Sequence, residues 1–138
     1  MPRKAVIAIV DDDRSVREAL TSLVRSLGYV AIAFECAEDL LKSKRRHSAS
    51  CLIADVQIPG MTGLELHNRL VTSGERIPTI LITDFPDEKA RERALQDGVI
   101  GYLTKPFSEA ACSRVFVRLS SAVKRVLERS RACRINDA

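Results

Sequence analysis

Residues 5–28, AVIAIVDDDRSVREALTSLVRSLG, hold the pattern that decides the fold. They open with an apolar run rich in Val and Ile, which is typical of a strand buried on both faces. Gly28 closes the stretch at the position where a glycine commonly ends a helix. Between the two, apolar side chains recur at the spacing of one helical face: Val16, Leu20, Leu23, Val24 and Leu27. The stretch therefore predicts a strand followed by a helix.

The same alternation continues along the whole chain. Further short apolar runs occupy residues 29–33, 51–54, 79–83 and 100–103. Helical segments are expected between them, at residues 37–44, around residues 64–70, from Pro86 at the first helical position to Gly98, and after Ser108. Residues 42–50, KSKRRHSAS, are expected to be a solvated loop. Five strands alternating with five helices predict an α/β fold with a doubly wound parallel sheet and helices on both faces.

Length and composition fit one globular domain. The chain has 138 residues, 46% hydrophobic and 29% charged, which excludes a disordered chain or a disulfide-stapled miniprotein. No apolar run approaches the roughly 20 residues of a membrane span, and the N-terminus does not resemble a signal peptide, so we expect a cytoplasmic protein. His47 and His67 are assigned no role. No zinc or redox site is indicated by the spacing of the cysteines, which are expected to be reduced and mostly buried: Cys36, Cys51, Cys112 and Cys133.

The net charge of +4 is concentrated near the C-terminus. From Arg114 onward there are seven basic and two acidic residues, and the remainder has 15 basic and 16 acidic residues. The body is therefore near neutral, which does not indicate a basic surface for nucleic acid.

Polar groups follow four of the five predicted strands. Asp11, Asp12 and Asp13 follow the first strand, and Asp55 follows the third. Thr83 ends the fourth strand, and Lys105 follows the fifth. Ligands of open parallel sheets bind beyond the carboxyl ends of the strands, so these groups should meet at one edge. Clustered carboxylates with room for water suit Mg²⁺, and an ammonium with a hydroxyl suits a phosphoryl group beside it.

Asp55 is the best candidate for a nucleophile that forms an aspartyl phosphate, because it stands alone at the end of a central strand. Each motif also has a plain structural explanation. Asp13 or the other aspartates could simply cap the following helix, and Asp55 and Lys105 could lie at ordinary strand–turn junctions. It is their coincidence at one sheet edge that favours a site.

These pieces together resemble the receiver domain of two-component response regulators, the CheY-like fold, and most closely its FixJ subfamily. The matching segments span residues 5 to about 120: Val10–Asp13, Asp55–Gly63, Leu81–Thr83, Gly98–Tyr102 and Lys105–Phe107. The resemblance implies a five-stranded parallel sheet in the order 2-1-3-4-5 with five helices in a three-layer sandwich. It also implies a receiver domain over residues 1–122. Regulators of the FixJ subfamily usually carry a DNA-binding helix-turn-helix after the receiver, but here we expect residues 123–138 to be a basic helical extension with no output domain.

The resemblance also implies roles for individual residues. Asp55 would accept the phosphoryl group from a histidine kinase or a histidine phosphotransfer protein. Mg²⁺ would be held by Asp12, Asp55 and the backbone carbonyl of Gln57, and by Asp11 through a water. Lys105, before a cis proline at residue 106, would contact the phosphoryl oxygens. Thr83 and then Tyr102 would move inward and change protein contacts on the face formed by the fourth helix, the fifth strand and the fifth helix. Such a domain is not a conventional enzyme, because it catalyses only its own phosphorylation and dephosphorylation.

Asp84 departs from the family pattern, which usually has alanine or glycine there. We expect this carboxylate to repel an anionic donor and to slow phosphorylation or alter dephosphorylation. It also keeps open a pseudo-receiver, which would bind partners without being phosphorylated. The receiver part of a DNA-binding transcriptional regulator is a further alternative.

The last predicted helix has residues, most of them apolar, at heptad spacing. It could pair two copies of the chain or contact a downstream protein. A solvated helix end is an equally good interpretation, because two heptads fall short of the three or four expected of a stable coiled coil. Direct DNA binding by this short helix is not expected, nor is a membrane partner. The spaced residues run from the sheet-facing part to the tail: Cys112, Phe116, Leu119, Val123, Val126, Ser130 and Cys133.

Overall fold

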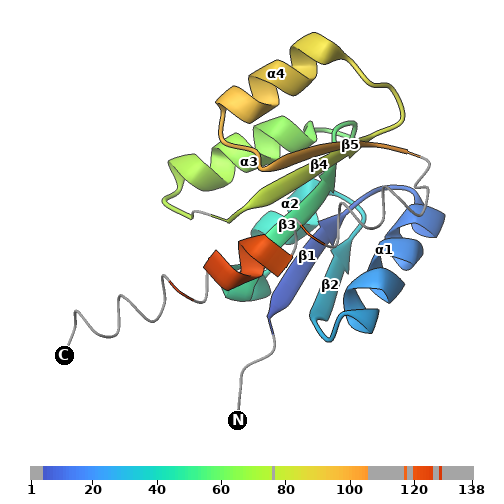
Figure 1. Cartoon of the computed structure of the whole chain (residues 1–138), viewed down its shortest axis with the longest axis vertical. Coiled ribbons are helices and arrows are strands. Elements are labelled where there is room, and N and C mark those ends of the chain that lie inside the picture. The colour runs from blue at the N-terminus through green and yellow to red at the C-terminus, as the bar shows by residue number, and fades with distance from the viewer. Residues whose placement is uncertain (1–4, 76, 106–116, 118–119, 126–127, 129–138) are drawn as a thin grey trace.

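Strands and helices alternate along the chain (Figure 1). The computed structural model describes residues 5–75, 77–105, 117, 120–125 and 128. Its strands are β1 (Val6–Val10), β2 (Val30–Phe34), β3 (Ala49–Asp55), β4 (Thr79–Thr83) and β5 (Gly101–Thr104). Its helices are α1 (Arg14–Ser26), α2 (Ala37–Lys42), α3 (Gly63–Thr72) and α4 (Glu88–Gln96), with a 3-10 helix η1 (Lys44–Ser48). Residues 120–125 are also helical and belong to the fifth helix.

The five strands form one sheet in the order β2-β1-β3-β4-β5, and every neighbouring pair is parallel. This confirms the predicted topology. The register aligns the carboxyl ends of the central strands, since Val10 lies opposite Ala54 and Asp55 lies opposite Ile82. Residues that follow these strands therefore emerge at a single edge of the sheet.

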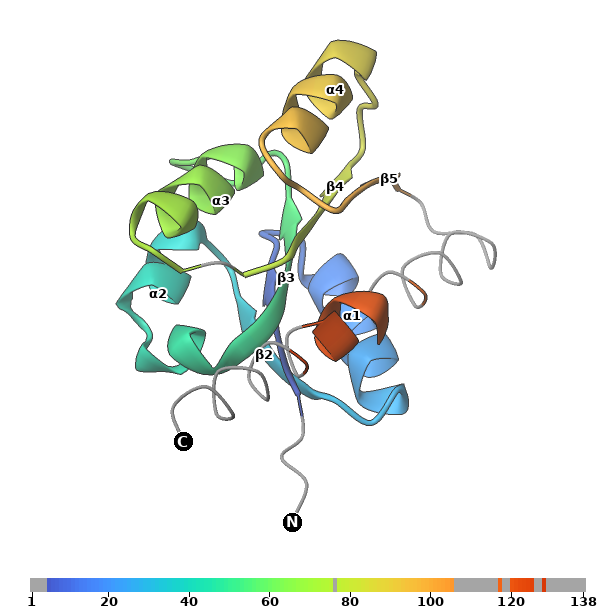
Figure 2. The ribbon, with the colours of Figure 1, turned by 60° about the vertical axis from the view of Figure 1, so that its left-hand side comes forward.

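Two apolar layers lie on opposite faces of the sheet. One contains Leu20 and Val24 of α1 together with Ala122 and Val123, and the other contains residues of α2, α3 and α4. Figure 2 shows α1 and the helical residues 120–125 on one side of the strands, with α2, α3 and α4 on the other. The strands β3 and β4 are buried along almost their whole length, as expected for a sheet covered on both faces.

The ends of α1 follow the predicted capping chemistry. The Asp13 side chain accepts hydrogen bonds from the backbone amides of Ser15 and Val16, so this aspartate is the N-cap. Gly28 has a φ of +87°, the left-handed conformation that glycine adopts most readily after a helix. The Asp13 carboxylate thus caps α1, whereas Asp11 and Asp12 remain candidates for a site at the carboxyl edge of the sheet.

Two predictions near helix ends were wrong. Helix α2 ends at Lys42, and the expected loop over residues 42–50 contains η1 and the first two residues of β3. Two kinds of contact order this basic segment. Ser43 accepts a hydrogen bond from the Arg45 amide, and the Glu75 carboxylate, distant in the sequence, pairs with Arg46 and His47.

The start of α4 also differs from the prediction. Pro86 is not the first helical residue, because the Asp87 side chain accepts hydrogen bonds from the amides of Lys89 and Ala90 and takes the N-cap position. Pro86 therefore precedes the cap.

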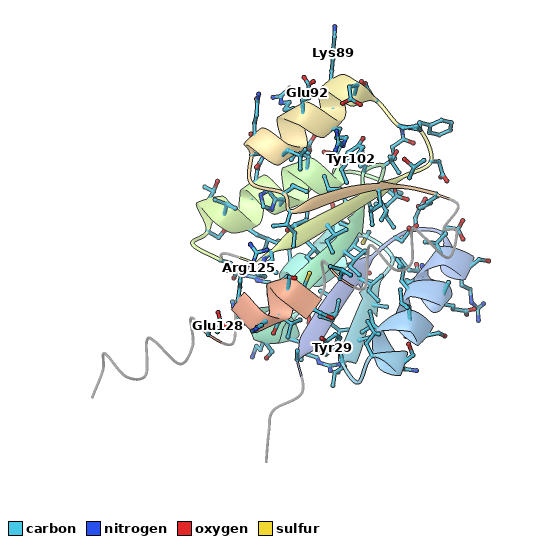
Figure 3. All side chains as sticks on the ribbon, viewed as in Figure 1. Tyr29, Lys89, Glu92, Tyr102, Arg125 and Glu128 are labelled. Carbon is cyan, nitrogen blue, oxygen red and sulfur yellow. The ribbon has the colours of Figure 1, made fainter. Side chains whose placement is uncertain are left out.

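The C-terminal segment is described at a few positions. Val123 is 4% exposed within the core, whereas Lys124 and Arg125 are exposed (Figure 3). Pro106, with the cis bond predicted before it, and most of the heptad positions lie outside the described residues. Among the helices that the structure describes, none is long and apolar enough to cross a membrane.

Candidate functional site

The residues predicted to meet at the carboxyl edge of the sheet do so. Asp11 and Asp55 are buried there, Asp12 is exposed, and the carboxylate oxygens of all three lie within 4.8 Å of one another. Lys105, which follows β5, is buried beside them and its backbone amide donates to the Thr83 carbonyl at 2.8 Å. This bond continues the pairing of β4 with β5 and fixes where the lysine side chain starts.

The Lys105 ammonium joins two of the carboxylates. Its Nζ lies 2.7 Å from Asp55 Oδ2 and 3.0 Å from Asp11 Oδ2, and the three side chains are at most 7% exposed. Burial would lower the pKa of Lys105, but hydrogen bonds to Asp55 and Asp11, together with their charges, raise it above its ordinary value. The ammonium is therefore charged at neutral pH.

The same cluster brings three carboxyl groups to one lysine. Burial raises the pKa of Asp11 and the Asp55 charge adds to this, while hydrogen bonds from the Asp13 amide and from Lys105 oppose it. With all three carboxylates ionised, one ammonium would leave an excess of two negative charges, which a divalent cation would balance. Oxygen donors with this excess, one of them open to water at Asp12, fit a divalent Mg²⁺ ion that retains part of its hydration shell.

The β3–α3 connection fixes the position of Asp55. Asp55 Oδ1 accepts a hydrogen bond from the Gln57 amide at 2.9 Å, and the Val56 amide donates to Ile82 at 2.8 Å. Gly63 begins α3 so close to β3 that a Cβ there would press on the Asp55 carbonyl and lie 2.9 Å from Leu81 Cδ2. A glycine is required by this close approach and not by its φ, which is not in the positive region.

Thr83 and Tyr102 flank a cavity beside the site. The Thr83 hydroxyl is buried, accepts a hydrogen bond from the Phe85 amide at 3.0 Å and lies 3.2 Å from the Phe85 carbonyl. Burial raises the pKa of Tyr102 and the Asp87 carboxylate adds to this, while a hydrogen bond with Thr83 opposes it. Both residues line a cavity of about 560 Å³. Gln57, which follows β3, and residues of the β4–α4 segment such as Phe85 complete its lining.

Asp84 lies at the mouth of the same site. Its carboxylate is 60% exposed and its Oδ2 is 4.0 Å from Lys105 Nζ. A third carboxylate thus faces the lysine that the phosphoryl group is expected to contact. The departure from the family pattern therefore lies where it can act on an incoming anion.

Two structural residues were not predicted, one beside the site and one at the opposite end of β4. The Arg17 guanidinium donates to the Asp11 backbone carbonyl at 2.8 Å and holds the β1–α1 turn. His67 is 5% exposed and bonds to two other elements, although the sequence assigned it no role. Its position could have been found, because the buried residues of α3 recur at helical spacing and include it: Gly63, Leu66, His67 and Leu70.

Fold and site define the class of protein. A family model for the response regulator receiver domain matches residues 7–115. The chain belongs to this family, as the resemblance in its sequence implied, and is a receiver domain of two-component response regulators. Domains of this family act as phosphoacceptors in signalling and typically bind Mg²⁺ at such an acidic pocket.

Particular relatives support this membership. The response regulator protein TodT of Pseudomonas putida is 42% identical over 107 residues, which cover 78% of this chain and 47% of TodT. The transcriptional regulatory protein FixJ of Bradyrhizobium diazoefficiens is 29% identical over 124 residues, which cover 90% of this chain and 59% of FixJ. The chain spans about half the length of the curated relatives it matches.

Solved structures agree with the sequence relatives. The response regulator StyR has 36% identity and a TM-score of 0.85, with 98% of this chain and 67% of StyR covered. The structure of FixJ-N has 25% identity and a TM-score of 0.75, with 89% of this chain and 96% of that structure covered. The predicted CheY-like architecture is confirmed.

Proposed function

We propose that Asp55 is the phosphoacceptor of this receiver and that Lys105, Thr83 and a bound Mg²⁺ assist the transfer. The observation that carries the proposal is the buried Asp55 carboxylate bonded at 2.7 Å to the Lys105 ammonium, beside two further carboxylates. A lone buried aspartate would be costly, whereas one held by an ammonium and an amide is oriented as a nucleophile.

The transfer needs little covalent chemistry from the protein. An Asp55 oxygen bonds to phosphorus of the phosphohistidine donor, the phosphorus–nitrogen bond breaks, and its electron pair returns to the imidazole of the donor. Lys105 stabilises the charge on the transferred group, and Arg17 and the Gln57 amide hold the two aspartates that surround it. Mg²⁺, held by Asp12, Asp55 and the Gln57 carbonyl and by Asp11 through water, would neutralise the phosphoryl oxygens when bound.

The switch would begin at Thr83. Its hydroxyl is engaged with Phe85 in the unphosphorylated chain, so a bond to the phosphoryl group requires that contact to be given up. Tyr102 lines the same cavity and would follow inward. A phosphoryl group that binds the inward state better would shift the population toward it and change the face formed by α4, β5 and the fifth helix.

The same proposal indicates the partners of the protein and the bounds of its receiver domain. The donor would be a histidine kinase or a histidine phosphotransfer protein in the cytoplasm, and the receiver would catalyse only its own modification. Residues 1–122 would form the receiver and residues 123–138 a basic extension that could pair two copies or contact a downstream protein. The relatives named as transcriptional regulators make a DNA-binding output elsewhere in a longer protein a compatible arrangement.

One observation favours a second candidate, the pseudo-receiver. The Asp84 carboxylate lies 4.0 Å from Lys105 Nζ and could discourage anionic donors. A phosphorylation-independent interaction module would keep the fold without using Asp55.

Phosphorylation by a small acyl-phosphate donor separates these candidates. We expect intact-mass spectrometry to show a gain of one phosphoryl group with Mg²⁺ and none after chelation. Asp55→Ala should abolish the gain, while the matched control Glu92→Gln, a carboxylate on exposed α4 (Figure 3), should not. No gain from this donor or from a phosphohistidine donor would favour the pseudo-receiver.

A further inference from the structure

His67 joins three elements through its imidazole ring. Its Nδ1 is 2.9 Å from Thr79 Oγ1, at the start of β4, and its Nε2 is 3.1 Å from the Asp97 backbone carbonyl, at the end of α4. A carbonyl oxygen only accepts, so Nε2 carries a proton and donates. The ring therefore links α3 to both β4 and the C-terminal end of α4 from a buried position.

The neighbouring residue holds the same point of α4. Asn68 Nδ2 donates to Asp97 Oδ2 at 3.1 Å. Asp97 is the C-cap of α4, and its carbonyl is among those that no residue of the helix can satisfy. His67 and Asn68, which we term the α3 clamp, thus grip the main chain and the side chain of one helix-terminal residue.

The opposite end of α4 and the segment before it bury no side chain. Residues 84–89 are exposed, Phe85 is 68% exposed, and Ala90 is half-buried. Ala94 is the one buried residue of α4 and lies in its last turn, followed by buried Val99. The N-terminal end instead borders the cavity lined by Thr83 and Tyr102.

We propose that the α3 clamp is a fixed pivot for α4, so that changes at Asp55 move the N-terminal half of the helix and the β4–α4 segment but not residues 97–99. This inference rests on the proposed function for its phosphorylation step. His67 is a positioning residue here, because it acts on the output face through Asp97 and touches none of the reacting groups. The responsive part of the α4 face is then the region around Phe85 and Ala90.

Two substitutions of His67 separate its hydrogen bond to Asp97 from its hydrogen bond to Thr79. In His67→Gln the longer amide can donate to the Asp97 carbonyl in place of Nε2, whereas in His67→Asn the shorter amide reaches Thr79 but not Asp97. Asn68→Ala removes the hydrogen bond from Asn68 Nδ2 to the Asp97 carboxylate. Because Asn68 is exposed, this substitution does not disturb the core. Gln96→Ala, in the same turn of α4 and exposed, is the control.

Hydrogen–deuterium exchange of the unphosphorylated chain tests the clamp itself. The amides of Asp97, Gly98 and Val99 donate to carbonyls within or at the end of α4 and report its local opening. We expect these three amides to exchange about five- to tenfold faster in His67→Asn, with a smaller increase in Asn68→Ala. His67→Gln and Gln96→Ala should match wild type. Equal exchange in all variants would overturn the clamp.

Exchange after phosphorylation by the acyl phosphate tests the pivot. In wild type we expect changed exchange over residues 84–91 and none over residues 97–99; in His67→Asn the change should extend to residues 97–99. An equal change along all of α4 in wild type would refute the pivot. Absence of a mass gain would overturn the proposed function and the pivot with it, while the comparison without phosphate would still decide the clamp.

Discussion

Replacing Gly63 with alanine should damage both the stability and the chemistry of the site. The added Cβ would press on the Asp55 carbonyl and lie 2.9 Å from Leu81 Cδ2 and 3.1 Å from the Asp55 carbonyl carbon. Backbone at the end of β3 cannot move aside as a flexible side chain does, so α3 or Asp55 must shift. The Gly63 amide also donates to the Val56 carbonyl at 3.0 Å and ties the same two segments together.

The expected cost follows from the crowding. Overpacking of this kind costs about 1–3 kcal/mol. The helix propensity gained from alanine is below about 1 kcal/mol, and it is reduced further because Gly63 is the first residue of α3. We expect a net loss of about 2 kcal/mol in the free energy of unfolding, or a fall in Tm of roughly 8 °C for a domain of this size.

Gly74→Ala is the matched control. Gly74 has a φ of +84° and nothing within 4 Å of the added carbon, so it should cost about 1 kcal/mol through backbone strain alone. Thermal unfolding followed by circular dichroism measures both losses, and intact-mass spectrometry measures phosphorylation rates. Gly63→Ala should slow phosphorylation severalfold and Gly74→Ala should not. A Gly63→Ala protein as stable and as quickly phosphorylated as wild type would refute the packing argument.

Three further predictions concern the charges and thiols of the domain. Lys105→Met should destabilise the fold by about 3 kcal/mol, because it leaves two buried carboxylates without their ammonium, and Mg²⁺ should restore part of the loss in urea unfolding; no effect of Mg²⁺ would contradict the cation site. Asp84→Ala should speed phosphorylation by acyl phosphate, and an unchanged rate would remove this carboxylate from the account. Burial raises the pKa of the Cys51 thiol to about 12, so this thiol stays protonated in the folded protein at pH 8 and a thiol reagent should label the Cys51 peptide only after unfolding. Labelling of native Cys51 as fast as of half-buried Cys36 would show that this core is open.

The alternation of strands and helices predicted an α/β fold with a parallel sheet and the edge where the site lies, whereas the strand order came from the family resemblance. Parallel strands share one direction, so polar residues after β1, β3, β4 and β5 had to meet. The contact between Lys105 and Asp11 joins residues 94 positions apart, and only the assumed topology could bring them together in advance. Family resemblance supplied the roles of individual residues, which the spacing alone left open.

Local details were predicted less well because tertiary partners decide them. The basic run after α2 reads as a loop, but Glu75, 29 positions beyond Arg46, pairs with it and orders η1. A lone histidine on a helix carries no signal of its role, and His67 acquires one only from Thr79 and Asp97 in other elements. The placement of Asp84 near Lys105 could be expected from the strand ends, whereas its effect on the transfer depends on a donor that the sequence does not describe.

Mapping the phosphoryl group to a single peptide tests the central claim most directly. The wild-type chain is treated with an acyl phosphate and Mg²⁺, digested under conditions that preserve acyl phosphates, and sequenced by tandem mass spectrometry. The account predicts one phosphoryl group per chain, carried by Asp55. A modification on another residue, or none while circular dichroism shows a folded chain, would contradict the assignment of this aspartate as the phosphoacceptor.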